Sequence, residues 1–284
     1  CPVKYCIDGS GDKVAIDHTR CIGCGSCIEA CTHEARYWVD DWDSFIAACE
    51  RHEKLIAIVA PSAAASFPGA IENLNGFLAS LGVSAFFDVS FGAELTIKSY
   101  LDHVMKNKPA TVIAQPCPAV VNYIELYRPE LIPYLAPADS PMLHTIKMIK
   151  EYYPEYAGYR IAVISPCIAK KQEFEAVGLG DFNVTFNAIS RYLLSHSKSL
   201  SQYSPVSFTS PPAERAVAFS TPGGLLGTLR REAPEIADRV RKIEGSHELY
   251  PYLDTLGTAI RRVVQPPHID CLNCSKGCNS GTGT

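Results

Sequence analysis

Hydrophobic residues in the larger, later part of the chain gather in short runs that are separated by stretches with helical spacing. Several runs lack a strict alternation of apolar and polar positions, as is typical of parallel strands covered by helices on both faces. The pattern therefore predicts an α/β domain over residues 55–284, with mostly parallel sheets flanked by helices. The predicted strands are KLIAIVA (54–60), SAFFDVS (84–90), ATVIAQ (110–115), YRIAVIS (159–165), VTFNA (184–188) and RAVAFS (215–220).

Residues 1–40 show a different pattern, that of a piece too small to be stable without a metal. The stretch GDKVAIDHTRC (11–21) predicts a short hairpin strand before a cysteine-rich loop, and CIEACTHEA (27–35) predicts the start of a helix. Residues 41–54 begin with an Asp/Ser capping pattern and continue with apolar residues at helical spacing. We therefore expect a small α+β domain over 1–40 and a connecting helix over 41–54.

Composition indicates a globular protein that does not bind nucleic acid. Of the 284 residues, 47% are hydrophobic and 20% are charged, which suits a chain that buries a core. The net charge is −4, from 26 basic and 30 acidic residues, so the basic surface that nucleic acid requires is not expected.

The chain also lacks the apolar segments that direct a protein into or across a membrane. No apolar run reaches the roughly 18 residues that cross a bilayer, and the N-terminus has no apolar signal core. We expect a cytoplasmic protein without membrane insertion. Because residue 1 is a cysteine and the last residues form a glycine-rich turn, we also expect a segment of a longer product, incomplete at both ends.

The cysteines are spaced for metal binding rather than for a disulfide framework. The sharpest motif is CIGCGSCIEAC, in which Cys21, Cys24, Cys27 and Cys31 follow one another at spacings of x2, x2 and x3. This spacing is typical of a 4Fe–4S loop, and in bacterial ferredoxins the fourth cysteine of such a run ligates the other cluster of a pair. We therefore assign Cys31 to a second cluster, whose other ligands would lie before residue 1.

The first three cysteines of this motif then need a fourth ligand from elsewhere. Cys1, which precedes Pro2, stands where a two-cluster ferredoxin would place that ligand. The alternatives are a zinc knuckle or inert thiols, but successive x2 spacings suit a cubane corner better than separated zinc pairs. Cys6 and Cys49 have no such context, and we expect them to be small buried residues.

Cysteines of the large domain also follow predicted strands. Cys117 stands in ATVIAQPCPAVV and Cys167 in YRIAVISPCIAKK, where the adjacent prolines end the strands and fix the loops. Ligands gather at the carboxyl ends of parallel strands, so these two thiols can converge. The terminal run HIDCLNCSKGCNSG adds Cys271, Cys274 and Cys278. By itself, this run can also bind zinc.

Taken together and in order, the motifs QPCP (115–118), SPCIAKKQE (165–173) and CSKGCNSG (274–281) resemble those of the iron–iron (FeFe) hydrogenases. The resemblance covers nearly the whole chain. It implies a hydrogenase-like catalytic domain of two lobes, preceded by a ferredoxin-like N-terminal domain. The supporting segments are APS (60–62), DVSFGAELTI (88–97), YRPELIPYLAPADSP (127–141) and STPGGLLGTLRRE (220–232).

The resemblance implies an H-cluster, in which a 4Fe–4S cubane is joined to a two-iron subcluster with CO, cyanide and azadithiolate ligands. Cys117, Cys167, Cys274 and Cys278 would hold the cubane, and Cys278 would also bridge to the two-iron unit. Cys271 has no counterpart in the resemblance, and we interpret it as a supporting or incidental residue.

The two-iron unit would have only one protein thiolate, so the resemblance implies that hydrogen-bond donors supply the remaining hold. Lys170 would donate to an anionic cyanide, and the loop 60–62 would offer donors from the opposite side. The expected catalytic residues are Cys278, Lys170, Ser62 and Pro61, and the expected cofactor contacts are Ala60, Ser165, Lys170 and Gly223.

The chain departs from the family where protons would move. Active members carry a cysteine, the first proton acceptor, at the position of Pro116, and proline has no ionisable group. The carboxylates expected in the helix after ELTI are also missing, since KSYLDHV (98–104) offers only Asp102 and His103. We expect His103 to be a surface residue rather than a replacement proton carrier.

Further changes affect the surroundings of the cofactor. Ser165 and Leu272 stand where active members commonly have methionine, and NSGTGT (279–284) replaces a triple glycine. These departures resemble the sensory branch of the family, in which a hydrogenase-like domain passes its response to a C-terminal or separate signalling domain.

We therefore expect a slow hydrogenase or H2 sensor that binds and heterolytically splits H2 at an H-cluster and passes electrons through 4Fe–4S clusters. Its redox partner would be a ferredoxin or an electron-bifurcating complex. The alternative is an iron–sulfur assembly or scaffold protein with the same fold and no two-iron unit. A plain ferredoxin-type carrier would leave the cysteines of the large domain unexplained.

Overall fold

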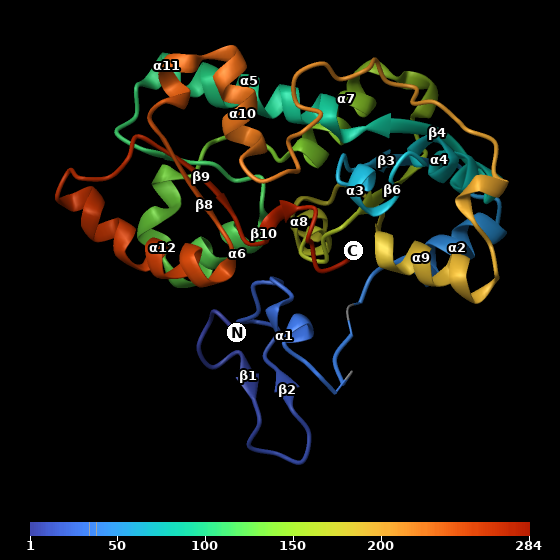
Figure 1. The fold of residues 1–284 in the computed structure, drawn as a ribbon, viewed down its shortest axis with the longest axis horizontal. Coiled ribbons are helices and arrows are strands. Elements are labelled where there is room, and N and C mark those ends of the chain that lie inside the picture. The colour runs from blue at the N-terminus through green and yellow to red at the C-terminus, as the bar shows by residue number, and fades with distance from the viewer. Residues whose placement is uncertain (34, 38) are drawn as a thin grey trace.

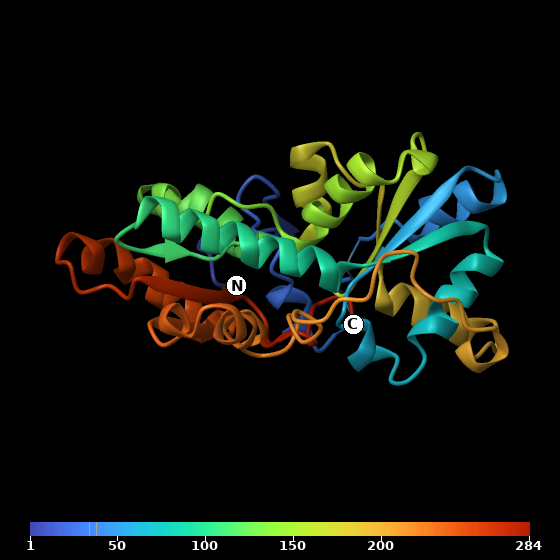
Figure 2. The ribbon, with the colours of Figure 1, turned by 90° about the horizontal axis from the view of Figure 1, so that it is seen from above.

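Two lobes form the larger part of the molecule, and each is built around one parallel sheet (Figure 1). The computed structural model describes residues 1–33, 35–37 and 39–284. Helices lie on both sides of each parallel sheet when the molecule is seen from above (Figure 2). The predicted α/β class is therefore confirmed. Within the described residues, no helix is both long enough and apolar enough to cross a membrane.

The sheet of the first lobe has the strand order β4-β3-β6-β7, and all neighbouring strands are parallel. Every residue of the central strand β3 is buried, which explains its uninterrupted apolar sequence. The strands are β3 (Leu55–Val59), β4 (Val83–Asp88), β6 (Arg160–Ser165) and β7 (Phe182–Thr185). The helices are α2 (Trp42–Glu50), α3 (Ala63–Ser66), α4 (Ile71–Ser80), α7 (Pro141–Tyr152), α8 (Lys170–Val177) and α9 (Phe186–Ser195), with the 3-10 turns η2 (Pro154–Tyr156) and η3 (Leu200–Gln202).

The sheet of the second lobe has the order β5-β9-β8, again with parallel neighbours. Helix α5 of this lobe packs against α7 of the first, and Gly92 permits the close crossing, because a Cβ there would lie 2.2 Å from the Pro141 carbonyl oxygen. The strands are β5 (Val112–Ile113), β8 (Val240–Glu244) and β9 (His268–Leu272), and β10 (Ser275–Cys278) follows β9. The helices are α5 (Val89–Asn107), α6 (Pro118–Tyr127), α10 (Gly224–Glu232), α11 (Pro234–Ala237) and α12 (Ser246–Arg261), with the 3-10 turn η1 (Pro129–Tyr134).

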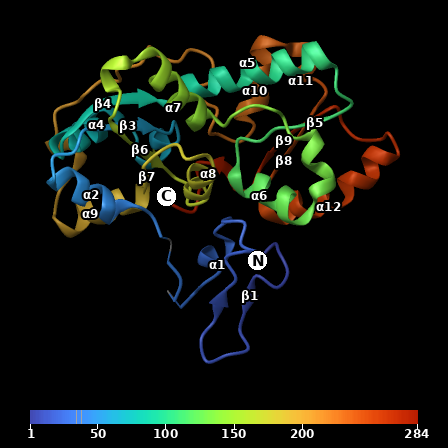
Figure 3. The same cartoon turned by 180° about the vertical axis from the view of Figure 1, so that it is seen from behind.

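In the view of Figure 1, the N-terminal piece lies below the two lobes. It contains the predicted hairpin, formed by the antiparallel strands β1 (Ile7–Asp8) and β2 (Ala15–Ile16). Seen from behind, its hairpin points away from the lobes while α1 (Ser26–Glu29) faces them (Figure 3). The helix predicted over residues 27–35 is much shorter, since α1 ends at Glu29. Glu34 of the predicted stretch lies outside the described residues.

The stretch RAVAFS (215–220) was predicted as a strand, and this prediction is wrong. The backbone N–H groups of residues 214–216 donate to the Glu94 carboxylate, at 2.6 to 3.3 Å, rather than to a neighbouring strand. Ala216 and Phe219 are buried in the second lobe. The run is therefore apolar because it packs into a core as a turn.

Two features near β7 also differ from the sequence pattern. The second half of VTFNA (184–188) belongs to α9, because the Thr185 hydroxyl accepts the Ala188 N–H at 3.2 Å and starts the helix.

Asp41 precedes α2 without capping it through its side chain. Its carboxylate instead pairs with Lys171, so it ties the connecting helix to the first lobe.

A glycine pair provides a test of the packing. A Cβ at Gly76 in α4 would lie 1.9 Å from the Ser204 carbonyl oxygen, whereas a Cβ at Gly227 in α10 would meet nothing within 4 Å. We expect Gly76→Ala to lower the free energy of unfolding by roughly 1–3 kcal/mol through overpacking. Gly227→Ala should raise it by up to about 1 kcal/mol, because alanine favours helix. Denaturant unfolding of both variants measures the difference, and equal effects would contradict the packing described.

Candidate metal centre

Four cysteines from the two lobes line one cavity near the carboxyl ends of their strands. Cys167 follows β6 of the first lobe, and Cys117 follows β5 of the second lobe and precedes α6. Cys274 lies between β9 and β10, and Cys278 ends β10. The structure thus brings together the four thiols that the sequence motifs pointed to.

Burial and mutual repulsion disfavour the ionised form of three of these thiols, those of Cys167, Cys274 and Cys278. Burial raises the pKa of Cys167 to about 11 and that of Cys278 to about 12, and it also raises the pKa of Cys274. Neighbouring cysteines add to each of these shifts, Cys117 among them in every case, because one thiolate disfavours a second charge close by. Iron binds thiolates, so cluster binding at this site must displace protons.

Four thiols that line one cavity can together hold a cluster of several irons. In a cubane each cysteine ligates its own iron, so the sulfurs surround the cluster without meeting at one point. Within the described part of the chain, no group of three or more His, Cys, Asp or Glu side chains could hold a single metal ion.

Two glycines, Gly277 and Gly281, let residues 274–283 pack closely into the cavity wall. Gly277 has a positive φ of 59°, and a Cβ there would lie 2.5 Å from the Ser220 carbonyl oxygen. A Cβ at Gly281 would lie 2.4 Å from the Pro166 carbonyl oxygen. These close approaches hold the turn that carries Cys278 against both lobes, and side chains at the two glycines would push it away.

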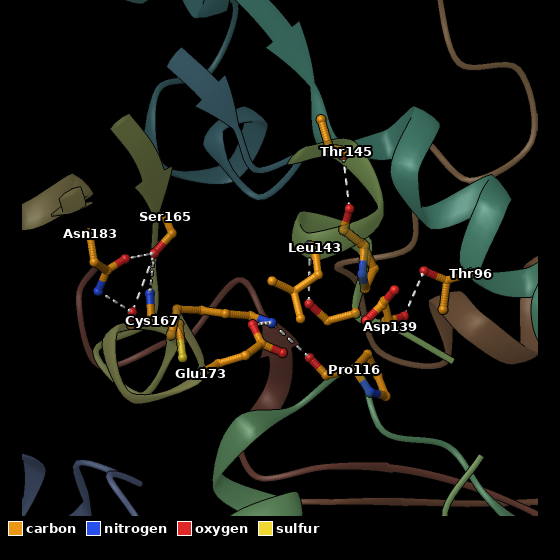
Figure 4. A network of polar contacts seen from close by, with 12 residues as sticks. Thr96, Pro116, Asp139, Leu143, Thr145, Ser165, Cys167, Glu173 and Asn183 are labelled. Atoms are coloured by element: carbon orange, nitrogen blue, oxygen red, sulfur yellow. Dashed lines mark hydrogen bonds and ion pairs between the residues drawn. The ribbon is translucent and has the colours of Figure 1, made fainter. Parts of the chain in front are cut away.

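Lys170, the first residue of α8, lies buried in the cavity wall with 5% of its surface exposed. Its ammonium group forms an ion pair with Glu173 at 2.6 Å and donates to the Pro116 carbonyl oxygen at 3.3 Å (Figure 4). The buried charge is therefore compensated, and Lys170 also fixes the loop in front of Cys117. Sequence reasoning overlooked Glu173, although it lies in the quoted motif SPCIAKKQE, one helical turn after the lysine.

The loop Ala60-Pro61-Ser62, between β3 and α3, forms another part of the cavity wall. The Ser62 side chain is fully buried, and its hydroxyl has no hydrogen-bond partner among the described residues. A buried hydroxyl in this state costs about 1–3 kcal/mol. An anionic group in the cavity would satisfy the hydroxyl, so the residues present fit a cofactor with anionic ligands.

Ser165 and Gly223 lie outside the lining of the cavity, in contrast to the expected cofactor contacts. Ser165 is fully buried behind the Cys167 loop, where its hydroxyl bonds to the Asn183 side chain at 2.9 Å and accepts the Cys167 N–H at 3.2 Å (Figure 4). Gly223 directly precedes α10 with a positive φ of 68°, and its N–H donates to the Glu244 carboxylate. Both residues therefore support the backbone around the site. Leu272 does line the cavity.

A second cavity, in the N-terminal piece, is lined by Cys1, Cys21, Cys24 and Cys27. The structure thus brings Cys1 to the three cysteines of the CIGCGSC loop, where a fourth ligand was expected. Cys6 lines the same cavity, and burial, with Cys21 nearby, raises its pKa to about 11. Nothing in the spacing motif indicated this position for Cys6.

Three other cysteines lie outside both cavities. Cys31 follows α1 and does not line the cavity of the motif's other three cysteines. Cys49 is buried in the core of the first lobe. Cys271 is fully buried on β9, and its thiol donates to the Ala114 carbonyl oxygen at 3.6 Å.

Known proteins resemble this chain in sequence. Iron hydrogenase 1 of Clostridium pasteurianum is 28% identical in a region that covers 59% of this chain and 40% of that protein. Nuclear prelamin A recognition factor of Rattus norvegicus is 30% identical, covering 45% and 33%, and Protein NAR1 of Arabidopsis thaliana is 25% identical, covering 57% and 40%. The matched region is less than half the length of each of these three relatives.

Solved structures share the fold. A variant of the FeFe hydrogenase HydA1 from Chlamydomonas reinhardtii superposes with a TM-score of 0.67 at 18% identity, covering 87% of this chain and 85% of that one. Residues 14–37 match the 4Fe-4S binding domain family, and residues 53–282 match the family described as iron only hydrogenase large subunit, C-terminal domain. The chain therefore belongs to the iron-only hydrogenase large-subunit family and carries a 4Fe-4S binding domain in front of its hydrogenase domain.

Proposed function

We propose that this protein is an H2-binding member of the family that carries an H-cluster and turns over slowly, as a sensor does. The observation that carries the proposal is the composition of the cavity wall. It offers four thiols, one buried ammonium group and one unpartnered hydroxyl, but no carboxylate or imidazole among the described lining residues. Such a site can hold an anionic iron cofactor, yet it has little means of moving protons quickly.

The four thiols would hold a 4Fe–4S cubane, with Cys278 as the bridge to a two-iron unit. When bound, that unit supplies the chemistry that cleaves H2, and the protein supplies position, charge and access. An ammonium group has three N–H donors. Lys170 uses two of them, for Glu173 and Pro116, which leaves one for an anionic ligand in the cavity. Ser62 would donate from the opposite wall.

Slow proton transfer follows from the residues around Pro116. Proline has no ionisable side chain, and the Pro116 carbonyl oxygen already accepts from Lys170. Asp102 is exposed on α5, where it pairs with Lys98 at 3.4 Å, and the His103 ring bonds to Asn107 on the same helix. Neither side chain lines the cavity. General acid–base catalysis requires a positioned titratable group, and the described lining has no titratable side chains other than Lys170 and the cysteines.

Electrons would leave through the cubane and then through the N-terminal cluster. Cys24 and Cys274 line a common cavity of about 390 Å³ between the N-terminal piece and the large domain. This neighbourhood supports transfer between the two clusters, with a ferredoxin or an electron-bifurcating complex as the outer redox partner. A C-terminal or separate signalling domain would receive the response of a sensor.

An iron–sulfur assembly or scaffold protein is the second candidate. It is favoured by the relatives named nuclear prelamin A recognition factor and NAR1, whose names do not describe hydrogenases. A scaffold would need the four thiols but not the buried lysine and the unpartnered hydroxyl. The two candidates therefore differ in whether the two-iron unit is present.

Infrared spectroscopy of protein matured anaerobically with the hydrogenase maturation enzymes distinguishes the candidates. We expect carbonyl and cyanide bands, which the two-iron unit alone supplies. Lys170→Ala should lose or weaken these bands, because the donor to the anionic ligand is removed. The control is Lys171→Ala, which removes a lysine that faces Asp41 instead. Absence of the bands from the matured wild-type protein would favour the scaffold.

Replacing Pro116 by cysteine tests the proton route. We expect Pro116→Cys alone to leave H2 oxidation as slow as in the wild type, because the described cavity lining offers no second acceptor beyond that position. The measurement is H2 uptake with an artificial electron acceptor. A large rise in turnover would mean that the rest of a proton route is intact.

Iron content tests the ligand set. Cys274→Ser should lose the iron of one cluster, about four atoms per chain, after anaerobic reconstitution. Cys271→Ser, three residues away, should keep the full iron content, because its hydroxyl can still donate to Ala114. Colorimetric iron analysis measures both. Equal loss in the two variants would argue against Cys274 as a specific ligand.

A further inference from the structure

Asn273 lies between the two cysteine-lined regions and belongs to neither set of predicted ligands. It follows β9 directly, precedes Cys274 and is only 7% exposed. Asn273 is among the residues that line the cavity of the four large-domain thiols, and it also lines the cavity shared by Cys24 and Cys274. Asn273 therefore contacts both the N-terminal piece and the large domain.

The hydrogen bonds of Asn273 use its whole amide group. Its Nδ2 donates to the Cys24 carbonyl oxygen at 3.2 Å and to the Cys274 Sγ at 3.6 Å, and its Oδ1 accepts from the Tyr250 hydroxyl at 2.7 Å. A carbonyl oxygen can only accept, so the NH2 side of the amide must face Cys24. Tyr250 must then be the donor to Oδ1. Burial raises the pKa of Tyr250, which keeps its hydroxyl protonated for this role.

We propose that Asn273 is a positioning residue that joins the two cluster sites: it fixes the Cys24 loop against the large domain and sets the reduction potential of the cluster at Cys274 through its N–H···S bond. The inference rests on the proposed cluster at the four large-domain thiols. Hydrogen bonds to the ligating sulfurs are among the factors that set cluster potentials. A donor favours the reduced, more negative state, so this bond raises the potential.

Burial strengthens the hydrogen bond from Asn273 to the Cys274 sulfur relative to the same bond in contact with water. Water is largely excluded from Asn273, and electrostatic interactions strengthen where the local dielectric is low. Tyr250 is buried too, so its bond to Oδ1 holds the amide in one orientation. The link is therefore a three-part chain, from Tyr250 through Asn273 to the two cysteines.

Asn122 provides a matched control on α6. Its Nδ2 donates to the Ile22 carbonyl oxygen of the same N-terminal loop at 3.3 Å, and to the Gln172 side chain at 2.7 Å. Asn122 thus ties the loop to the large domain through the same kind of amide–carbonyl bond, but within the described residues its side chain bonds to no cysteine sulfur. A variant at Asn122 separates loss of docking from loss of the N–H···S bond.

The test uses the full chain reconstituted anaerobically with iron and sulfide, without the two-iron unit. Redox titration followed by EPR gives the midpoint of each cluster, and the Cys274→Ser variant identifies the signal of the large-domain cluster. We expect Asn273→Ala to move that midpoint to a more negative potential at full iron content. Tyr250→Phe should move it in the same direction by less, and Asn122→Ala should leave it unchanged.

Hydrogen–deuterium exchange of the 21–27 loop gives a second readout. It should become faster in both Asn273→Ala and Asn122→Ala, because each variant removes a bond to a loop carbonyl. An Asn273→Ala midpoint equal to wild type at full iron content overturns the inference. If that variant fails to hold iron, an unchanged midpoint in Tyr250→Phe overturns it. Missing large-domain iron in the wild type would instead overturn the proposed function.

Discussion

The insertion of the glycine-rich segment 274–283 between the two lobes is the contact on which the candidate centre depends. The Cys278 N–H donates to the Ser220 carbonyl oxygen at 2.8 Å, and the Gly283 N–H donates to the Pro166 carbonyl oxygen at 2.7 Å. Each lobe supplies one thiol at the end of a parallel strand, and the segment supplies the other two. Without the insertion, the lobes would present separate cysteines and no common cavity.

The same arrangement explains the chemical character of the site. The cavity wall combines prolines, small residues and thiols with one compensated ammonium group, so it suits a preformed anionic cofactor held by shape and by a few donors. Proton movement is left poorly supported in the described lining. In the proposed function, Pro116 is the position at which proton movement is weakest, because its side chain has no ionisable group.

Much of this architecture could be predicted from the sequence, because buried parallel strands and cysteine spacings leave strong local signals. The strands at 55–59 and 160–165 coincide with apolar runs, and the thiols that converge belong to motifs with fixed proline and glycine neighbours. The failure at RAVAFS has a physical cause, since an apolar run shows burial but not which group satisfies its backbone. There, the Glu94 carboxylate accepts the N–H groups that a strand would otherwise pair.

Contacts made by single polar side chains could not be predicted, because their partners lie far away in the chain. Asn273 bonds to Cys24 across 249 positions, and no spacing rule connects the two. Ser165 was assigned to the cofactor from a resemblance, yet its hydroxyl serves the Cys167 loop instead. Sequence reasoning therefore pointed to the four thiols that line one cavity, but not to the polar side chains that hold the loops around them.

The position of the inserted segment also affects how the protein matures. The sheet of the first lobe has been synthesised before residues 274–283 leave the ribosome, whereas β9, the middle strand of the second sheet, ends directly before this segment. A nascent chain would then pass through a form whose seam is still open toward solvent. The proposed cofactor would enter through that seam, and docking of residues 274–283 would close it afterwards.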